Sequence, residues 1–343
     1  MTSKPSGSHV VDALLADGLE VRVLDLLHPL AHGSTPDYLS EDAEFIHADV
    51  RNRDALTEAL HGVNAICHQA AMVGLGVDMS DITEFVSHNA LGTATLLEAL
   101  SAARFRGSLV LASSMVVYGD GYYSCAEHGV LPAPPRSPAD LDAGRFEPLC
   151  PRCGEALEPQ AIAEDAPLAP ASVYAATKVH QEHLAFAFAR ETGVPVTALR
   201  YHNVYGPRMP RDTPYAGVAS IFASALARGE SPRVFEDGRQ LRDFVHVRDV
   251  ARANRIALTR SEAYHGALNV ASGSPSSVGE MAERLAAATG SGSPRPVVTG
   301  EWRAGDVRHV FASPDRAREA IGFAAEEDFA KGMREFAVLP LRA

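Results

Sequence analysis

Leu109-Val110-Leu111-Ala112-Ser113-Ser114 is an apolar run that ends in two hydroxyl residues. An apolar run of this length, without polar alternation, is typical of a strand buried on both faces of a parallel sheet. Helix-like segments separate it from comparable runs elsewhere in the chain, and this order predicts an α/β protein with a doubly wound parallel sheet. Ligands of such sheets bind at the carboxyl ends of the strands. The comparable runs are residues 21–25, 45–49, 65–71 and 196–200.

The intervening segments predict helices at residues 10–16, 54–60, 82–103, 173–192, 218–227 and 278–289. Residues 120–170 interrupt the alternation, because this stretch is rich in proline, glycine and charge. A structureless loop of that length is uncommon inside a compact domain, so we expect something specific to organise it.

The composition excludes several classes of protein. The chain has 343 residues, 46% of them hydrophobic, and a formal net charge of −12. This charge argues against a general nucleic-acid binder and against attachment to an anionic membrane surface. No apolar run reaches the roughly 18–20 residues that span a bilayer, and the N-terminus lacks the apolar stretch of a signal peptide. We therefore expect a cytoplasmic protein without disulfides.

Tyr174-Ala175-Ala176-Thr177-Lys178 carries the clearest chemical signal. Residues four apart on a helix lie on one face, so the Tyr174 phenol and the Lys178 ammonium are expected to be neighbours. Ser114 ends its strand at the sheet edge where ligands bind. A phenol beside an ammonium and a hydroxyl can exchange a proton with a sugar alcohol, once the cation lowers the phenol pKa from about 10. We predict that Ser114, Tyr174 and Lys178 are the catalytic residues.

The chain resembles the extended short-chain dehydrogenases/reductases that act on nucleotide sugars, the NAD-dependent epimerase/dehydratase family. The resemblance covers almost the whole chain. It implies a Rossmann-like fold, with a dinucleotide-binding domain at residues 1–202 and a smaller α/β substrate-binding domain at 203–343, from which 241–270 returns to the first. The motifs that carry it are Asp25, Asp49-Val50, His68-Gln69-Ala70-Ala71, Asn89-Ala90-Leu91-Gly92-Thr93, Ser113-Ser114-Met115-Val116-Val117-Tyr118-Gly119, Tyr174 with Lys178, and residues 199–207, 242–247 and 303–306.

The resemblance also implies ligands and roles. Asp25 would accept the adenosine ribose hydroxyls of NAD, and Asp49 and Val50 would contact its adenine. Further contacts to the cofactor would come from Gly7, Ala70, Asn89, Tyr174, Lys178 and Tyr201. The diphosphate of a nucleotide sugar would be anchored by Asn203, Arg242 and Arg303, because guanidinium groups suit phosphate oxygens. Helices 82–103 and 173–192 would pair in a homodimer.

Met115 and Val116 distinguish activities within the family. Dehydratases carry an acid pair directly after the catalytic hydroxyl residue, and this chain has two apolar residues there. A dehydratase is therefore excluded, and a decarboxylase is disfavoured. The leading expectation is a 4-epimerase that acts through a transient 4-keto sugar, on a dTDP- or UDP-hexose. A nucleotide keto-sugar reductase is the alternative, since the same three catalytic residues serve both reactions.

The irregular segment contains two pairs of potential metal ligands, Cys125-x2-His128 and Cys150-x2-Cys153. Two such spacings fit a tetrahedral Cys3His zinc site, and Pro151-Arg152-Cys153-Gly154 resembles a zinc-ribbon knuckle. We predict a structural zinc that orders this insertion at 120–170; the alternative is surface thiols with an incidental histidine. The knuckle, together with Pro214-Tyr215-Ala216-Gly217-Val218, looks like the dTDP-L-rhamnose 4-epimerase branch, beside the UDP-glucose 4-epimerases.

The N-terminus departs from the family pattern, which begins with a strand and a G-x-x-G-x-x-G loop. Gly7 matches the last glycine of that loop, while the first two glycine positions fall on Met1 and Lys4. We expect the first strand of the sheet to be missing. An upstream start, an altered terminus and a catalytically impaired nucleotide-sugar-binding pseudoenzyme are the explanations that the sequence leaves open.

Overall fold

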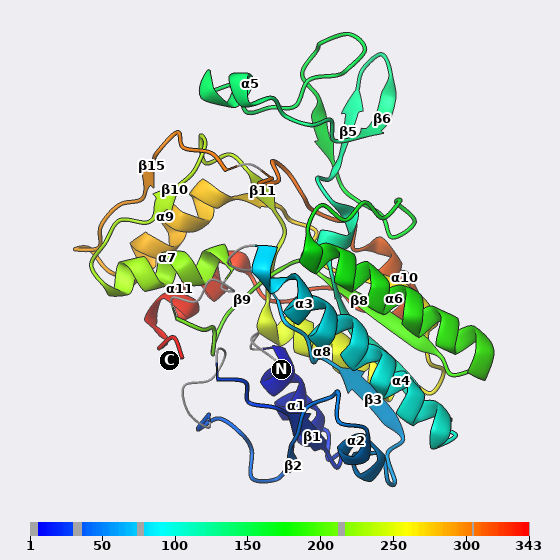
Figure 1. Cartoon of the computed structure of the whole chain (residues 1–343). Coiled ribbons are helices and arrows are strands. Elements are labelled where there is room, and N and C mark those ends of the chain that lie inside the picture. Colours follow the sequence, from blue (N-terminus) through cyan, green and yellow to red (C-terminus); the bar gives the residue numbers. More distant parts are fainter. Residues whose placement is uncertain (1–5, 30–35, 74–78, 212–216, 304, 343) are drawn as a thin grey trace.

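The structure is a computed structural model that describes residues 6–29, 36–73, 79–211, 217–303 and 305–342. Its centre is a four-stranded parallel sheet in the order β13-β8-β4-β3 (Figure 1). The two central strands are buried along nearly their whole length, as their uninterrupted apolar sequences predict. The predicted α/β fold is therefore confirmed. The strands are β3 (Ala65–His68), β4 (Ser108–Ser114), β8 (Val196–Tyr201) and β13 (Gly266–Val270).

Helices cover both faces of this sheet, because successive side chains of a strand point to opposite sides. Leu109 and Leu111 of β4 face α4 (Gly92–Ala102) and α6 (Val173–Thr192). Val110 and Ala112 face the other layer, which contains α8 (Val247–Thr259) and α10 (Asp315–Ile321). The helix α1 (Ser6–Ala16) packs against α8 in the same layer. In the described part of the chain, no helix is long and apolar enough to cross a membrane.

The sheet is divided at its N-terminal side. The strands β1 (Arg22–Asp25) and β2 (Glu44–His47) form a separate parallel pair. Among the residues described, nothing pairs with β3 on the side away from β4, and residues 65–67 are only partly buried. A doubly wound sheet places its first strand between these two parts. Met1 and Lys4, which occupy the first two glycine positions of the family pattern, lie outside the described residues.

The predicted helix 82–103 is continuous but changes its pitch. It begins as α3 (Ile82–Phe85), widens to a π-helical segment at Val86–Leu91 (η2), and continues as α4. A π-helical turn accommodates one extra residue and often lies at a functional site. Gly92 follows this segment, and a Cβ there would lie only 2.8 Å from Cγ1 of Val50, so glycine allows the close approach.

The C-terminal part has a separate apolar core between α7 (Val218–Ala227), α9 (Val278–Thr289) and α11 (Phe329–Val338). Short strand pairs connect it to the central sheet. They are β9 (Asn203–Tyr205) with β12 (Phe244–His246), β10 (Arg233–Val234) with β15 (Val297–Val298), and β11 (Leu241–Arg242) with β14 (Ser276–Ser277).

The insertion at 120–170 contains more regular structure than its sequence indicates. It forms a small antiparallel sheet in the order β6-β5-β7 and a short helix, α5 (Pro138–Asp142). Figure 1 shows this unit standing out from the rest of the molecule, above the carboxyl ends of the central strands. The strands are β5 (Tyr122–Cys125), β6 (Gly129–Pro132) and β7 (Glu158–Gln160); α2 (Arg53–Ala59), η1 (Met79–Asp81) and η3 (Met115–Tyr118) complete the described elements.

Candidate active site and metal cluster

Ser114, Tyr174 and Lys178 come together at the carboxyl end of β4. Ser114 is the last residue of β4 and lies opposite Tyr201 of β8 in the parallel register. Ser172 caps α6 by accepting a hydrogen bond from the Ala175 N–H at 3.1 Å, which places Tyr174 in the first helical turn. All three catalytic candidates are at least nine-tenths buried. The predicted cluster therefore lies at the edge where ligands of such sheets bind.

Lys178 is held in place by the strand that carries Ser114. Its Nζ donates a hydrogen bond of 2.9 Å to the main-chain oxygen of Ala112. The same nitrogen lies 6.0 Å from the centroid of the Tyr174 ring. Packing of α6 on β4 therefore fixes the ammonium group beside the phenol, as the four-residue spacing predicts.

Tyr174 lies against an apolar wall formed by Ala71, Met72, Val73 and Phe85, with Val116 at its edge. Burial raises the pKa of Tyr174 above its usual value, and a hydrogen bond with Ser114 opposes this only in part. The direction is opposite to the one expected from the Tyr174–Lys178 spacing. In this environment the phenol keeps its proton, and a further positive charge near the ring is needed to release it.

Asp25, Asp49 and Val50 follow the first two strands of the structure. Asp25 ends β1, is 7% exposed, and accepts the Leu27 N–H at 2.8 Å, so its carboxylate is positioned beside the turn. Asp49 is engaged by Arg51, whose guanidinium and N–H bind both carboxylate oxygens at 2.6–3.0 Å. Burial raises the pKa of Asp49, but the hydrogen bonds and charge of Arg51 lower it further, below its usual value. The Asp49 carboxylate is thus already satisfied within the protein, and Val50 is 9% exposed.

Asn89 and Tyr201 are braced by neighbouring side chains. Asn89 is fully buried, exchanges hydrogen bonds with the main chain of Met72 at 2.7 and 2.9 Å, and donates to Thr177 Oγ1 at 2.9 Å. It therefore ties the segment after β3 to the helix that carries Tyr174 and Lys178. The Tyr201 hydroxyl bonds to Gln69 and Asn254 at 2.7–2.9 Å. Both residues position the site through such contacts.

Gly7 and Ala70, two of the predicted cofactor contacts, each adjoin one residue of a hydrogen-bonded pair, Ser6 with Gln69. Gly7 is in the first turn of α1, which starts four residues earlier than predicted. Its neighbour Ser6 is 3% exposed and donates a hydrogen bond of 3.3 Å to Gln69 Oε1, next to Ala70. The beginning of α1 thus contacts the carboxyl end of β3. A helix N-terminus at this place suits a phosphate group.

The three predicted diphosphate anchors differ in their surroundings. Arg242 donates to the main-chain oxygens of Leu241, Val307 and Arg308 at 2.5–3.0 Å, and burial lowers its pKa to about 10. Within the described residues no carboxylate forms an ion pair with it. Arg303 is exposed, and its guanidinium lies 4.4 Å from the Phe235 ring centroid. The Asn203 Oδ1 atom is buried without a hydrogen-bond partner in the described structure.

Cys125, His128, Cys150 and Cys153 form one compact cluster. Their ligand atoms all lie within 4.8 Å of one another. Cys125 Sγ is 3.4 Å from His128 Nδ1 and 3.6 Å from Cys153 Sγ, and Cys150 Sγ is 3.5 Å from His128 Nδ1. Tetrahedral zinc with Zn–S distances of about 2.3 Å and Zn–N distances of about 2.0 Å separates its ligands by about 3.4–3.8 Å. The two predicted pairs therefore have the spacing of a tetrahedral site.

One charged network of the structure is not predicted from the sequence. Arg136, Glu147, Glu236 and Arg308 form a charged network between the insertion and the C-terminal loops. Arg136 and Glu236 are 100 residues apart in the chain, and Glu147 and Arg308 are 161 apart, so no local spacing predicts their contact. One signal is present, because Asp237-Gly238 is a typical turn dipeptide. It marks the loop but not its partners.

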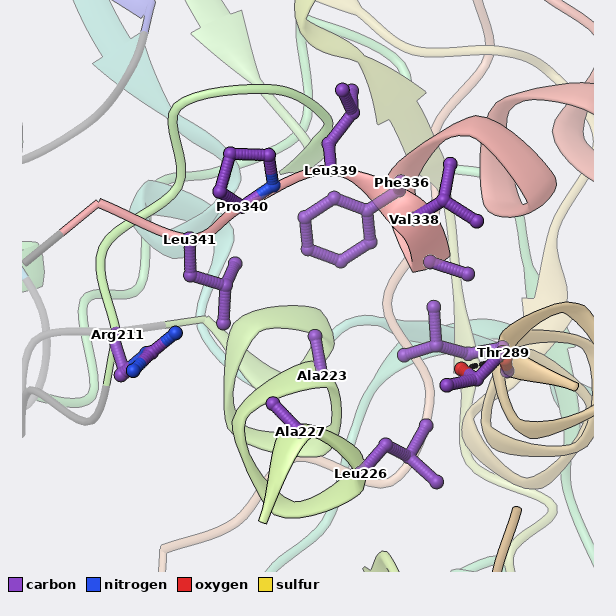
Figure 2. A pocket seen from close by; sticks show the side chains of 12 residues that line it. Arg211, Ala223, Leu226, Ala227, Thr289, Phe336, Val338, Leu339, Pro340 and Leu341 are labelled. Atoms are coloured by element: carbon purple, nitrogen blue, oxygen red, sulfur yellow. Dashed lines mark hydrogen bonds between the residues drawn. The ribbon is translucent and has the colours of Figure 1, made fainter. Parts of the chain in front are cut away.

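A separate cavity of about 240 Å³ lies in the C-terminal part, between α7, α9 and α11 (Figure 2). Its lining is apolar apart from Arg211 and Thr289, and Figure 2 shows Phe336 and Leu226 pointing into it. It shares no residue with the cluster around Tyr174. The chemistry predicted from the sequence therefore does not belong to this cavity.

Comparison with known proteins supports the predicted family resemblance. Residues 6–139 and 152–271 match the NAD dependent epimerase/dehydratase family, and the match skips part of the insertion. A dTDP-L-rhamnose 4-epimerase from Burkholderia thailandensis is 30% identical over 338 residues, which are 96% of this chain and 90% of that protein. A putative UDP-glucose 4-epimerase from Methanocaldococcus jannaschii is 28% identical over 331 residues, 96% of this chain and 92% of that protein.

Solved structures show the same fold. UDP-glucose 4-epimerase from Thermus thermophilus, in complex with NAD, superimposes with a TM-score of 0.77 at 28% identity. The alignment covers 98% of this chain and 96% of that one. UDP-glucose 4-epimerase from Thermotoga maritima with UDP-glucose gives a TM-score of 0.76 at 25% identity, covering 98% and 95%. The predicted family resemblance and fold are thereby confirmed.

Proposed function

The chain belongs to the NAD dependent epimerase/dehydratase family, and from that premise we propose that it is an NAD-dependent 4-epimerase of a dTDP- or UDP-hexose. The observation that carries the proposal is the buried cluster of Ser114, Tyr174 and Lys178 at the carboxyl end of β4. Several of its relatives are also named as epimerases. The residues after Ser114 support epimerisation over dehydration, because Val116 adds an apolar side chain to the wall around Tyr174.

Tyr174 would take the proton of the sugar 4-hydroxyl, and Ser114 would bridge the sugar oxygen and the phenol. The buried environment raises the pKa of Tyr174, so the base forms only with positive charge beside it. Lys178 contributes one such charge, held on the Ala112 oxygen. Bound NAD+ supplies the hydride acceptor and a second positive charge. The residues that fit this cofactor are Asp25, the start of α1, and the Asn89-braced segment after β3.

Inversion requires the 4-keto sugar to present its other face while its diphosphate stays bound. Arg242, Arg303 and Asn203 are proposed as the anchors. Arg242 carries a positive charge on a guanidinium that touches only carbonyl oxygens in the described structure, and Asn203 has an unpartnered buried oxygen. The Arg242 guanidinium gains a charged partner when an anion binds, which favours this role. The hydride would then return to C4 on the other face of the sugar, while Tyr174 gives its proton back to the C4 oxygen.

We propose that the cluster of three cysteines and His128 binds a structural zinc ion. The donor atoms lie at tetrahedral spacing, and Cys125 and Cys150 are part of the small core of the insertion. Four protein ligands fill a tetrahedral site, so the ion would stabilise the insertion without touching substrate. Zinc per chain in the purified protein, measured by mass spectrometry, tests this, and a ratio near zero after metal-replete expression contradicts it.

We also propose a homodimer through α3–α4 and α6. Ile82, Val86 and Leu91 are apolar residues that are 37%, 46% and 54% exposed on the first of these helices. Exposed apolar side chains grouped on one helix are typical of an interface between proteins.

The proposed activity is tested by incubating the protein with NAD+ and with dTDP-, UDP- and GDP-sugars, and by recording C4 inversion by NMR. Conversion of one sugar to its C4 epimer, without net consumption of NAD+, supports the epimerase. Stoichiometric use of NAD(P)H with a keto sugar indicates the reductase instead. Absence of bound cofactor and of turnover, in a variant that also carries a restored first strand and glycine loop, contradicts both.

A further inference from the structure

The insertion and the C-terminal loops are joined through one buried carboxylate. Glu236 is 2% exposed and accepts a hydrogen bond from Arg136 of the insertion at 2.8 Å. The other oxygen of Glu236 accepts from Arg308 at 2.9 Å. Arg136 also donates to the main-chain oxygen of Asp306 at 2.6 Å. Arg136 of the insertion thus contacts two segments of the C-terminal part near Arg303, one at Glu236 and one at Asp306.

Arg308 adds a second connection from the same loops to the insertion. It is 2% exposed and pairs with Asp237 at 2.6 Å and with Glu147 of the insertion. Glu147 also contacts His309 at 2.8 Å. Arg308 and Glu236 are both buried, whereas Asp237 and Glu147 are 34% and 42% exposed, so the Glu236 carboxylate is the group that would be left buried and unpaired if its arginine partners were lost. The geometry of the loop at 234–238 is therefore set partly by the insertion.

The loop at 234–238 in turn supports a proposed phosphate anchor. Glu236 has a φ of 51°, a left-handed conformation that residues other than glycine rarely adopt. The ring of the preceding Phe235 lies 4.4 Å from the Arg303 guanidinium. Next to Arg303, the Trp302 indole N–H donates to Asp142 of α5 at 2.9 Å. Contacts from the insertion therefore reach both sides of Arg303.

The metal cluster closes the segment from which these contacts come. Arg136, Asp142 and Glu147 lie between His128 and Cys150, and both of these are cluster residues. Binding one ion to both ends of this segment shortens the free chain and limits the conformations available to it. Cys125 and Cys150 are also core residues of the insertion, so its small apolar core alone offers little to replace the ion.

We propose that metal binding at Cys125, His128, Cys150 and Cys153 sets the affinity of the protein for the diphosphate of its nucleotide substrate, through Arg136 and Glu236. The inference rests on the proposed function, because it takes Arg303 as a phosphate anchor. Arg136 and Glu236 are positioning residues in this account. Loss of the ion would release the segment that carries Arg136, relax the loop at 234–238, and leave Arg303 unsupported.

The test is titration of the full chain with UDP and with dTDP by calorimetry, before and after removal of zinc with a chelator and again after zinc is returned. We expect affinity to fall about tenfold on zinc removal, as when a charged hydrogen-bond partner is lost, and to return with zinc. Trp302 is the only tryptophan and touches the insertion, so its fluorescence should change in parallel.

Variants keep the test informative if the zinc-free protein loses other structure. Arg136→Ala should keep its zinc yet bind UDP or dTDP about tenfold more weakly, and it should melt at a lower temperature because buried Glu236 loses a partner. Arg145→Ala is the matched control, since Arg145 is exposed and pairs with Asp140 of the same insertion. Equal affinity of Arg136→Ala and Arg145→Ala, or affinity that ignores zinc removal, overturns the coupling. No binding of either nucleotide by any form overturns the proposed substrate class as well.

Discussion

The Lys178 ammonium donates a hydrogen bond of 2.9 Å to the carbonyl oxygen of Ala112, two residues before Ser114. One strand therefore positions two of the three catalytic candidates, while the helix on it supplies Tyr174. This arrangement keeps one positive charge beside a phenol whose pKa burial raises, and the second charge that the proposed mechanism needs would come from bound NAD+. The lysine cannot move away from the ring without losing this hydrogen bond, so its charge stays beside the phenol.

Tyr174→Phe should abolish most turnover while the protein remains folded. The ring keeps its packing against Phe85, but the hydroxyl that accepts and returns the proton is lost. Positioned acid–base groups contribute about 10²–10⁴-fold to rate, so we expect kcat to fall by that factor. Bound NAD and the melting temperature should change little. Unaltered turnover of this variant with the best nucleotide sugar would refute the assigned base.

Acid should destabilise the protein through His68, which lies near Lys178 and contacts Thr93 at 2.9 Å. Burial first, and then the Lys178 charge, lower the pKa of His68 from 6.5 to about 3. Below pH 6.5 the unfolded chain therefore binds a proton that the folded chain does not bind. The free energy of unfolding decreases as the pH is lowered from 6.5 to about 3. His68 alone should account for about 2 kcal/mol of the loss between about pH 8 and about pH 5.

Urea unfolding of His68→Gln at the two pH values checks this. The variant should lose less stability between the higher and the lower pH than the parent protein. His183→Gln is the control, because His183 is exposed on α6. Parallel losses in all three proteins would show that His68 is protonated in the folded state.

Cys150→Ser should remove the metal and destabilise the insertion. Cys150 is 2% exposed and lies 3.5 Å from His128, so its thiolate is a ligand that a hydroxyl does not replace. We expect zinc to fall from about one per chain to near zero, and protease cleavage to begin within residues 120–170. Cys67→Ser is the control, since Cys67 lies in β3 outside the cluster. Full zinc content in Cys150→Ser would contradict the ligand assignment.

Leu91→Glu should convert the proposed dimer to a monomer. Leu91 is 54% exposed at the end of the π-helical segment, and a charge there would be buried unpaired in the interface. Light scattering after size-exclusion chromatography gives the mass directly. Val130→Glu is the matched control, because Val130 is an apolar, 68% exposed residue on the insertion. A dimer that survives Leu91→Glu would place the interface elsewhere.

The sequence predicted the parallel sheet, the helix that carries Tyr174 and Lys178, and the grouping of three cysteines with His128, because each has a local signature. Leu109–Leu111 read as a buried strand, Tyr174 and Lys178 share a helical face, and the cysteine pairs have ligand spacing. The predicted lowering of the Tyr174 pKa was wrong, because burial raises this pKa. The burial comes from Phe85 and Met72, which belong to other segments of the chain.

The contacts between the insertion and the C-terminal loops could not be predicted, because they join segments that are far apart in the sequence. Arg136 and Glu236 are 100 residues apart, and each alone reads as a solvated surface charge. Only the fold brings them together and buries them. The small sheet β6-β5-β7 was missed because its strands are short and surrounded by proline and glycine, which weaken the periodic signal.

The central claim is that Tyr174 and Lys178 serve a 4-epimerase that removes hydrogen from C4 and returns it to the same carbon. The most direct test uses a dTDP- or UDP-hexose labelled with deuterium at C4, incubated with the protein and NAD+ in ordinary water. NMR should show the C4 epimer with the deuterium retained at C4. Inversion with loss of the label to solvent, or no inversion of any hexose by a protein with bound NAD, would contradict the account.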